Sequence, residues 1–262
     1  MGSLSLRSLS GLPEIRPGED LGRLLVQALG AQQPPAALVD GDIIVLAQKA
    51  VSKAEGAVVD LTTVRPSAQA TQIAAEWEMA GGPARRDPRA IQVVLDQSAE
   101  IVRATRGVLI CRTHHGFVCA NAGVDASNSP HAETVIVLPK DPDASARAIR
   151  ARLRELTGIA PGVLITDSFG RAWRHGQCDI AIGCAGITPL EDWRGRTDAN
   201  GRELAATWLA VADGVAAAAD LARSKDSSEP AILLAGLERL VTEQDGPGAA
   251  ALLRPLEEDL FR

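Results

Sequence analysis

Two short acidic segments contain the residues of this chain that are best suited to chemistry. In the first, residues 121–128, small residues surround the carboxylate of Asp125. The second is an apolar run, residues 163–166, followed directly by Asp167 and Ser168. Hard oxygen ligands suit Mg²⁺ or Mn²⁺, so aspartates at the ends of buried strands can hold such an ion. Together the two segments predict a metal-assisted active site, whereas a single aspartate more often only caps a turn.

The first acidic segment also predicts close contact between the backbone and a ligand. The residues around Asp125 in this segment include Ala122, Gly123, Ala126 and Ser127, all with small side chains. Small side chains leave room for a ligand to approach the main chain. Asn128 adds an amide that can recognise a polar edge of the ligand.

Several basic side chains could bind an anion beside such a metal. Lys53, with Lys49 close by, follows a predicted strand and is expected in a loop, where it can contact phosphate oxygens as a point charge. Arg171 and Arg174 follow Asp167 closely and form a candidate anion clamp. Alternatively, the lysines are simply solvated, and the segment with the two arginines is an ordinary surface loop. No P-loop, nucleophile elbow or dinucleotide fingerprint occurs, so the residues alone indicate a metal-dependent enzyme with an anionic ligand.

Composition and charge restrict the class of protein. The net charge of −6 argues against the concentrated positive surface that nucleic acid or a membrane face requires. Aromatic residues make up only 3% of the chain, so Ala, Val, Leu and Ile must build the core. No signal peptide opens the chain, and no apolar run approaches the ~18 residues of a membrane span. We therefore expect a cytoplasmic protein with neither nucleic-acid nor membrane partners.

The four cysteines are expected to be buried free thiols. Cys111, Cys119, Cys178 and Cys184 form no C-x-x-C pair and no zinc-ligand spacing with the four histidines. Thiols of this kind are usual in a reducing compartment.

The apolar patterning predicts an α+β fold, because helices and strands are mixed rather than strictly alternating. Helices are predicted over residues 21–29, 66–80, 88–97, 142–156 and 205–221. Strands are predicted over residues 43–47, 107–113, 117–120, 133–138, 163–166, 180–182 and 231–234. We predict a single domain over residues 1–262, with a weak subdomain seam at 139–142.

Taken together, these segments resemble one enzyme family, the coenzyme F420-0:γ-glutamyl ligases. This family is also met as the N-terminal half of a longer two-domain enzyme. Matching segments occur in family order at residues 11–15, 41–42, 51–56, 121–128, 141–145, 165–174, 176–177, 195–204, 211–213 and 253–255. An ordered series of matches is far more specific than any single motif.

The resemblance implies an acid–amino-acid ligase that forms GDP and requires Mg²⁺ or Mn²⁺, with K⁺ as a further candidate ion. Such enzymes add L-glutamate to a deazaflavin precursor, coenzyme F420-0, and extend a γ-linked polyglutamate tail. GTP phosphorylates the terminal carboxylate, and the glutamate amine displaces phosphate from the acyl phosphate. The resemblance also implies two intimately packed subdomains with mixed sheets and an intertwined homodimer.

Residue by residue, the resemblance implies roles for the matching positions. Asp125 and Asp167 would bind one metal ion, and Ser168 a second. The catalytic group would comprise these two aspartates with Arg171 and Arg174. The nucleotide would contact Leu12, Pro13, Glu14, Ile15, Gln48, Lys53, Asn128, Arg223, Ser224 and Lys225.

Four positions depart from the family pattern. Gly214 follows Asp213 where Glu is usual, and Ser224 stands where Gly is usual. Lys225 replaces an acidic ligand of the second metal ion, and Gln48 replaces a small hydroxyl residue. These departures leave three alternatives open: an amide ligase with a different carboxylate acceptor, a metal-dependent phosphohydrolase, and a catalytically silent nucleotide-binding protein.

Overall fold

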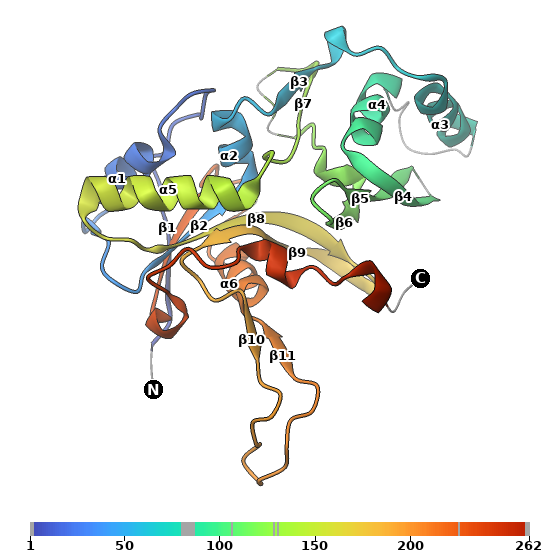
Figure 1. Ribbon diagram of the computed structural model, residues 1–262. Helices are drawn as coiled ribbons and strands as arrows, with labels where there is room; N and C mark the ends of the chain where they lie inside the picture. Colours follow the sequence, from blue (N-terminus) through green and yellow to red (C-terminus); the bar gives the residue numbers. More distant parts are fainter. Residues whose placement is uncertain are drawn as a thin grey trace.

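The centre of the fold is a five-stranded mixed sheet (Figure 1). The computed structural model describes residues 3–79, 87–105, 107–127, 129, 131–224 and 226–259. The strand order is β1 (Ser5–Ser8), β12 (Ala231–Ala235), β2 (Ile43–Ala47), β8 (Gly162–Arg171) and β9 (Arg174–Ala185). Strands β2 and β8 run parallel, and the other neighbouring pairs run antiparallel. This mixed sheet with its helices confirms the α+β prediction.

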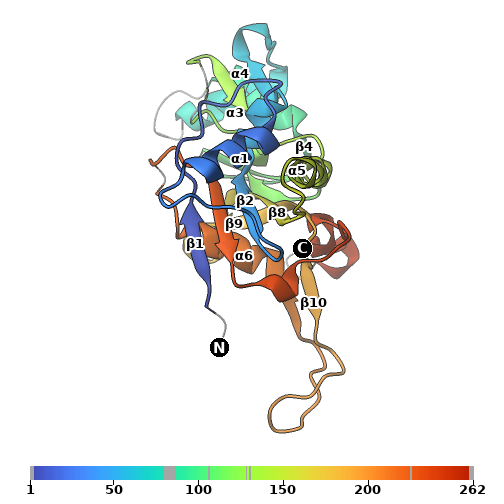
Figure 2. The same ribbon diagram turned by 90° about the vertical axis from the view of Figure 1, so that its left-hand side faces the viewer.

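Helices cover both faces of this sheet (Figures 1 and 2). Helices α1 (Leu21–Ala31) and α5 (Pro142–Thr157) pack with one core cluster, and α6 (Val211–Asp220) packs with another. Coverage on both sides explains why β2 is a continuous apolar run. Within the described ranges, no helix is both long and apolar enough to cross a membrane.

Local signals set the ends of the outer helices. Asp20 caps α1 by accepting from the Arg23 backbone N–H, and Asp141 caps α5 by accepting from that of Ala144. Helix α5 ends at Gly158, whose φ of 80° is left-handed and suits glycine. The predicted helices at 21–29 and 142–156 are therefore confirmed.

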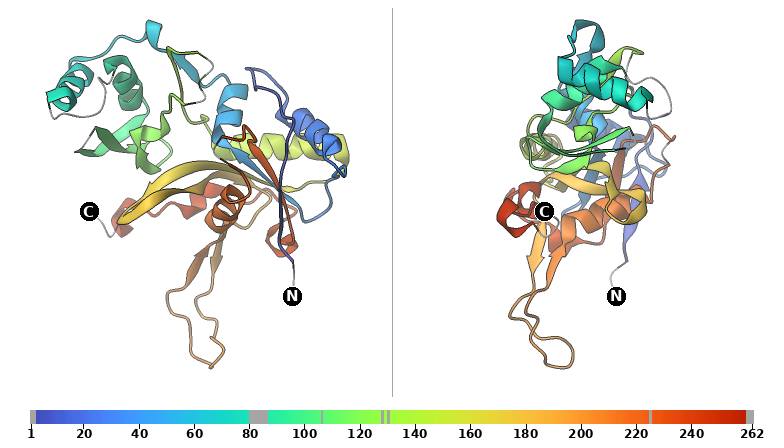
Figure 3. Two further views of the ribbon diagram at one scale, coloured as in Figure 1. Left: turned by 180° about the vertical axis from the view of Figure 1, so that it is seen from behind. Right: turned by 90° about the vertical axis from the view of Figure 1, so that its right-hand side faces the viewer.

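A second lobe forms between α2 and α5 along the chain (Figure 3). It contains α3 (Ala68–Met79), α4 (Pro88–Asp96) and the sheet β4 (Ser98–Thr105), β5 (Val108–Thr113) and β6 (Val118–Ala120). The β5–β6 hairpin turns at residues 114–116, as predicted, whereas β4 was missed. The short pair β3 (Val58–Asp60) and β7 (Thr134–Ile136) connects this lobe to the main sheet. The single domain over residues 1–262 and its subdomain seam at 139–142 stay predictions.

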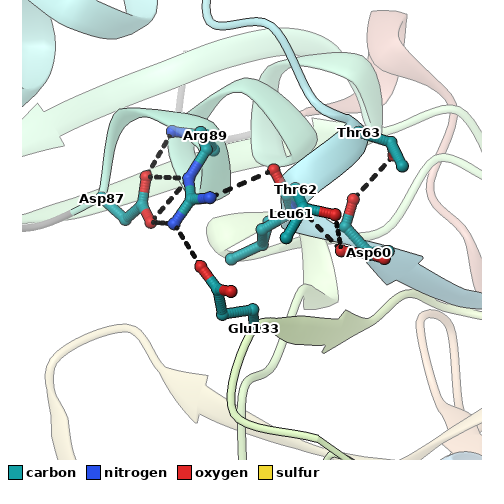
Figure 4. Close-up of polar contacts among 7 residues, drawn as sticks. All are labelled: Asp60, Leu61, Thr62, Thr63, Asp87, Arg89 and Glu133. Atoms are coloured by element: carbon teal, nitrogen blue, oxygen red, sulfur yellow. Dashed lines mark hydrogen bonds and ion pairs between the residues drawn. The ribbon is translucent and has the colours of Figure 1, made fainter.

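Polar contacts hold the connecting strands against the second lobe (Figure 4). Arg89 of α4 forms ion pairs with Asp87 at 2.6 Å and with Glu133, just before β7, at 3.1 Å. Asp60 at the end of β3 accepts from the backbone N–H and the hydroxyl of Thr62. Arg89 thereby ties the start of β7 to α4, and Ile136 of β7 in turn pairs with Asp125 of the first acidic segment.

Four predicted elements differ from the structure, and strand pairing explains three of them. The loop expected at Lys53 is a helix, α2 (Gln48–Ala54), that begins directly after β2. Strands β8 and β9 extend well beyond 163–166 and 180–182, because they pair with each other as far as Arg171 and Arg174. The helix predicted over 205–221 begins only at Val211, because β11 (Trp208–Ala210) pairs with β10 (Leu190–Asp192).

The prediction of buried free thiols is confirmed for three of the four cysteines. All four are free; Cys111, Cys119 and Cys184 are buried, and Cys178 is half-buried. Burial raises the pKa of Cys119 and of Cys184 to about 12. These two thiols therefore stay protonated and behave as core side chains.

Gly183 provides a test of how α5 packs on the sheet. A Cβ atom there would lie 2.4 Å from the backbone carbonyl carbon and oxygen of Pro142, so the helix itself would have to shift. We expect Gly183→Ala to lower the free energy of unfolding by about 2–3 kcal/mol. At Gly214 on α6, a Cβ meets nothing within 4 Å, so Gly214→Ala should raise it by about 0.5–1 kcal/mol. Urea unfolding checks both variants; equal effects would contradict this packing.

Candidate active site

A cleft of about 1210 Å³ brings most of the predicted site residues together. It lies where β2 passes into α2, beside the middle of β8 and β9. Residues 13–17, the segment around Asp125 and the segment after α6 complete its walls. Asp125, Asp167, Ser168 and Lys53 all line it, although they come from three separate parts of the chain. The structure therefore brings the two acidic segments together in one cleft.

Asp125 forms one wall of the cleft. Its backbone is fixed by an isolated β-bridge to Ile136, with hydrogen bonds of 3.0 and 2.8 Å. Its carboxylate accepts from the Ser127 N–H at 2.7 Å and pairs with the Lys49 ammonium at 2.6 Å. Burial raises the pKa of Asp125, but the hydrogen bonds from Lys49 and Ser127 outweigh it and hold the pKa below its usual value. Asp125 is therefore ionised at neutral pH.

Two of the small residues in the first acidic segment pack against the protein rather than face a ligand, whereas Ser127 lines the cleft. Ala122 is buried in the second lobe, with a left-handed φ of 52°. A Cβ at Gly123 would lie 2.7 Å from the Leu138 side chain. These two small residues allow the segment to pack against the protein itself, and neither lines the cleft.

Asp167 lies inside strand β8 rather than at its end. It pairs with Ile180 of β9, and the strand continues to Arg171. Burial raises the pKa of Asp167 to about 6, and the nearby charges of Asp179 and Asp125 raise it as well. A carboxylate with such a pKa in a cleft is a sign of a functional site.

Helix α2 places two lysines on the same side of the cleft. Lys49 and Lys53 are four residues apart, so they lie on one face of the helix. Lys53 Nζ pairs with Glu14 Oε1 at 2.5 Å, while Lys49 pairs with Asp125. The Gln48 side chain is buried and its Oε1 accepts from the Ser52 hydroxyl at 2.8 Å. The lysines are therefore held by a helix rather than by the expected loop, and each is next to a carboxylate.

Asp179 is a cleft residue that the sequence interpretation did not identify. It lies directly opposite Ser168 in the β8–β9 register and is 1% exposed. It accepts hydrogen bonds from Ser168 Oγ at 2.6 Å and from Thr166 Oγ1 at 2.8 Å, and it forms a short ion pair with Arg223. The available signal was a single carboxylate next to the apolar run 180–182. It could be interpreted only once the strand pairing was known.

The remaining predicted residues divide into three groups. Pro13, Glu14, Ile15, Gln48, Arg223 and Ser224 line the cleft. Leu12 instead packs at the edge of the main core, and Arg171 and Arg174 lie exposed at the tip of the β8–β9 hairpin, outside the cleft lining. Asn128 and Lys225 are not among the described residues.

The donor set of the cleft fits a hard divalent cation. No three His, Cys, Asp or Glu side chains form a ready metal-binding group in the described part of the chain. Mg²⁺ is usually bound by one or two carboxylates, with water and substrate phosphates as its other ligands. Asp125 and Asp167 supply such a pair, with Ser168 as an additional oxygen. Burial, with the nearby charges of Asp179 and Asp125, raises the pKa of Asp167, and a bound cation would stabilise its ionised form.

Comparisons with known proteins agree with the resemblance seen in the sequence. Residues 11–236 match the family described as F420-0:Gamma-glutamyl ligase. Coenzyme F420:L-glutamate ligase of Methanopyrus kandleri is 41% identical over 267 residues, which covers 100% of both chains. The protein of the same name from Methanothermobacter thermautotrophicus is 41% identical over 99% of both chains. That from Haloarcula marismortui is 39% identical over 97% of this chain and 94% of the relative.

Proposed function

Because the chain belongs to the F420-0:γ-glutamyl ligase family, we propose that it adds L-glutamate to coenzyme F420-0 with GTP and Mg²⁺ or Mn²⁺. The observation that carries this proposal is the cleft in which Asp125, Asp167 and Ser168 meet Lys49, Lys53 and Arg223. Oxygen ligands and fixed cations in one cleft suit a nucleotide triphosphate with its metal ion. K⁺ remains a further candidate ion.

The proposed reaction has two steps. First, a carboxylate oxygen of the acceptor attacks the γ-phosphorus of GTP, and the bond to the β-phosphate oxygen breaks, which gives an acyl phosphate and GDP. Next, the glutamate amine attacks the acyl carbon, inorganic phosphate leaves, and the amine proton passes to solvent. Repetition on the new terminal carboxylate extends the γ-linked tail.

The cleft residues would mainly bind and orient these groups. Lys49, Lys53 and Arg223 would contact phosphate oxygens. The segment Pro13–Ile15 would form one wall of the nucleotide site. Asp125 and Asp167 would hold the divalent ion, with Ser168 as a ligand of a second ion. A bound ion neutralises charge on the phosphate oxygens during transfer. Arg171 and Arg174 would act only with an acceptor that reaches the hairpin tip.

The departure at Gly214 does not reach this cleft. Gly214 is exposed on α6, and a Cβ there would meet no atom within 4 Å. The preceding Asp213 accepts from the Ala181 backbone N–H at 2.9 Å and so ties α6 to β9. A glycine at this position is therefore compatible with the proposed ligase, and position 225 lies outside the described residues.

We also propose a homodimer, for which the arm formed by β10, β11 and the segment between them is the candidate surface. The arm projects from the main sheet, away from the second lobe (Figures 1 and 3). It carries the half-exposed Trp208 and Leu209, with the Arg194 guanidinium 4.3 Å from the Trp208 ring centre. An extended arm with exposed apolar side chains suits contact with a second copy.

Mass spectrometry of the acceptor tests the proposed reaction. Coenzyme F420-0 is incubated with the protein, GTP, Mn²⁺ or Mg²⁺, and L-glutamate, and mass increments of one glutamate are expected only when GTP is present. GTP hydrolysis that is independent of acceptor and glutamate would instead indicate a phosphohydrolase. Glutamate addition to another carboxylate but not to F420-0 would indicate a different acceptor.

The ion pair between Lys49 and Asp125 predicts that loss of Lys49 strengthens metal binding and weakens nucleotide binding. A cation must compete with the Lys49 ammonium for Asp125 Oδ2. We expect Lys49→Met to tighten Mn²⁺ binding about 2- to 5-fold without nucleotide, as for a partly exposed ion pair. Loss of a charged phosphate donor should weaken GDP binding about 10-fold. Titration calorimetry measures both, with Lys140→Met outside the cleft as control; weaker Mn²⁺ binding by Lys49→Met would contradict this competition.

A further inference from the structure

Asp179 organises two other side chains of the cleft. Its Oδ1 accepts from Ser168 Oγ at 2.6 Å, and its Oδ2 accepts from Thr166 Oγ1 at 2.8 Å and from Arg223 Nη2. An ionised carboxylate can only accept hydrogen bonds. The hydroxyl hydrogens of Ser168 and Thr166 therefore point at Asp179.

This arrangement fixes the direction of the Ser168 oxygen. A hydroxyl has one hydrogen and two lone pairs, and its hydrogen is free to rotate unless a partner holds it. Because Asp179 holds the hydrogen, the lone pairs of Ser168 are directed away from Asp179. Ser168 lines the cleft, so its oxygen is prepared to act as a ligand or an acceptor there.

Arg223 is held at the same time. Its side chain is only 8% exposed, and Nη2 is bound to Asp179 and to Thr166 Oγ1, the latter at 3.1 Å. Nη1 is buried, and no group in the described part of the chain accepts its hydrogen bond. A buried guanidinium with an unused donor is costly unless a ligand completes its hydrogen bonds. Arg223 lines the cleft, so an anionic ligand there can supply the missing acceptor.

We propose that Asp179 is a positioning residue that prepares Ser168 for the metal ion and Arg223 for a nucleotide phosphate oxygen. The carboxylate holds one edge of the guanidinium plane, and the planar fork then presents Nη1 in a fixed direction. The same carboxylate sets the Ser168 hydroxyl. This inference rests on the proposed function, because it takes the ligand to be a nucleotide with its divalent ion.

Asp179→Asn tests this role, since the amide keeps the shape but loses the charge and one acceptor. GDP binding in the presence of Mn²⁺ is measured by calorimetry, and binding of Mn²⁺ alone by electron paramagnetic resonance. We expect both affinities to fall about 10- to 100-fold, as for other residues that orient metal ligands. Asp213→Asn is the matched control, because Asp213 is a half-buried carboxylate on the neighbouring helix that accepts from a backbone N–H outside the cleft. It should leave both affinities unchanged.

Double-variant cycles separate positioning from general support of the fold. The effect of Asp179→Asn on GDP affinity should shrink when Arg223 is already Met, and its effect on Mn²⁺ affinity should shrink when Ser168 is already Ala. A merely structural carboxylate would give additive effects in both cycles. Additive effects, or wild-type affinities in Asp179→Asn, would overturn the proposal.

A further variant covers the case in which Asp179→Asn does not fold. Asp179→Asn with Arg223→Met leaves no unpaired buried charge, and its Mn²⁺ affinity is compared with that of Arg223→Met alone. Weaker Mn²⁺ binding in the double variant supports positioning through Ser168, and equal binding overturns it. If wild-type protein binds neither GDP nor Mn²⁺, the proposed function fails together with this inference. If it binds both and the variants do not differ, only the inference fails.

Discussion

Asp167→Asn is expected to abolish ligation while the protein stays folded. The variant removes one of the two carboxylates proposed to hold the divalent ion, and such an ion contributes several kcal/mol to the transition state. Because each 1.36 kcal/mol is tenfold in rate, we expect glutamate addition to fall about 10³-fold or more. The measurement is the mass-spectrometric assay with saturating GTP and Mn²⁺. Ligation near the wild-type rate would remove the metal role proposed for Asp167.

The same variant should be at least as stable as the wild type when no metal is bound. The folded pKa of Asp167 is about 6, above its ordinary value of 3.8, and burial is the main cause. A raised pKa means that the folded state gains stability from the bound proton below pH 3.8, and that this gain is lost as the pH rises through 6. At pH 7 the ionised side chain costs about 3 kcal/mol, which the uncharged Asn avoids.

Thermal unfolding of the metal-free proteins between pH 4 and pH 8 checks whether Asp167→Asn raises or lowers stability. The midpoint of Asp167→Asn should exceed that of the wild type above pH 6, and the difference should shrink towards pH 4. Asp125→Asn is the contrasting variant, because hydrogen bonds from Lys49 and Ser127 hold the Asp125 pKa below its usual value. It should therefore lose stability at neutral pH. A destabilised Asp167→Asn would contradict the electrostatic account of this site.

Lys53→Ala is expected to weaken nucleotide binding about 10- to 100-fold, the range for loss of a hydrogen bond to a charged group. Lys53 is mostly buried in the cleft, where its ammonium is screened less than a surface charge. GDP binding in the presence of Mn²⁺ should show the loss in calorimetry, and the effect on ligation should appear mainly in KM for GTP. Unchanged affinity would rule out the proposed phosphate contact.

Substitution of Glu14 provides a control for Lys53→Ala, because it should change nucleotide affinity in the opposite direction. Its carboxylate is 2.5 Å from Lys53 Nζ but is largely exposed, so it competes with the ligand only weakly. Glu14→Gln should therefore tighten GDP binding by up to about fivefold, as expected for an exposed ion pair. Weaker binding in this variant would show that Glu14 itself supports the nucleotide, beyond its pairing with Lys53.

Several features could be predicted from the sequence because they depend on neighbouring residues. Asp20, Asp141 and Gly158 end their helices through hydrogen bonds and backbone angles within one helical turn. The α+β class followed from apolar patterning. Asp125 was identified as a carboxylate among small residues, and Asp167 as a carboxylate directly after an apolar run. The ordered motifs indicated the family that the comparisons then matched.

Only the tertiary structure decided how the charged groups of the cleft are paired. Lys49 and Asp125, Lys53 and Glu14, and Arg223 and Asp179 are distant in sequence and meet only in the folded chain. The same strand pairing extends β8 past Asp167, places Arg171 and Arg174 at a distant hairpin tip and buries Asp179. Sequence patterns indicate which side chains can bind a metal ion or phosphate. Their distances and burial, and with them their pKa values, depend on contacts between segments that no local pattern encodes.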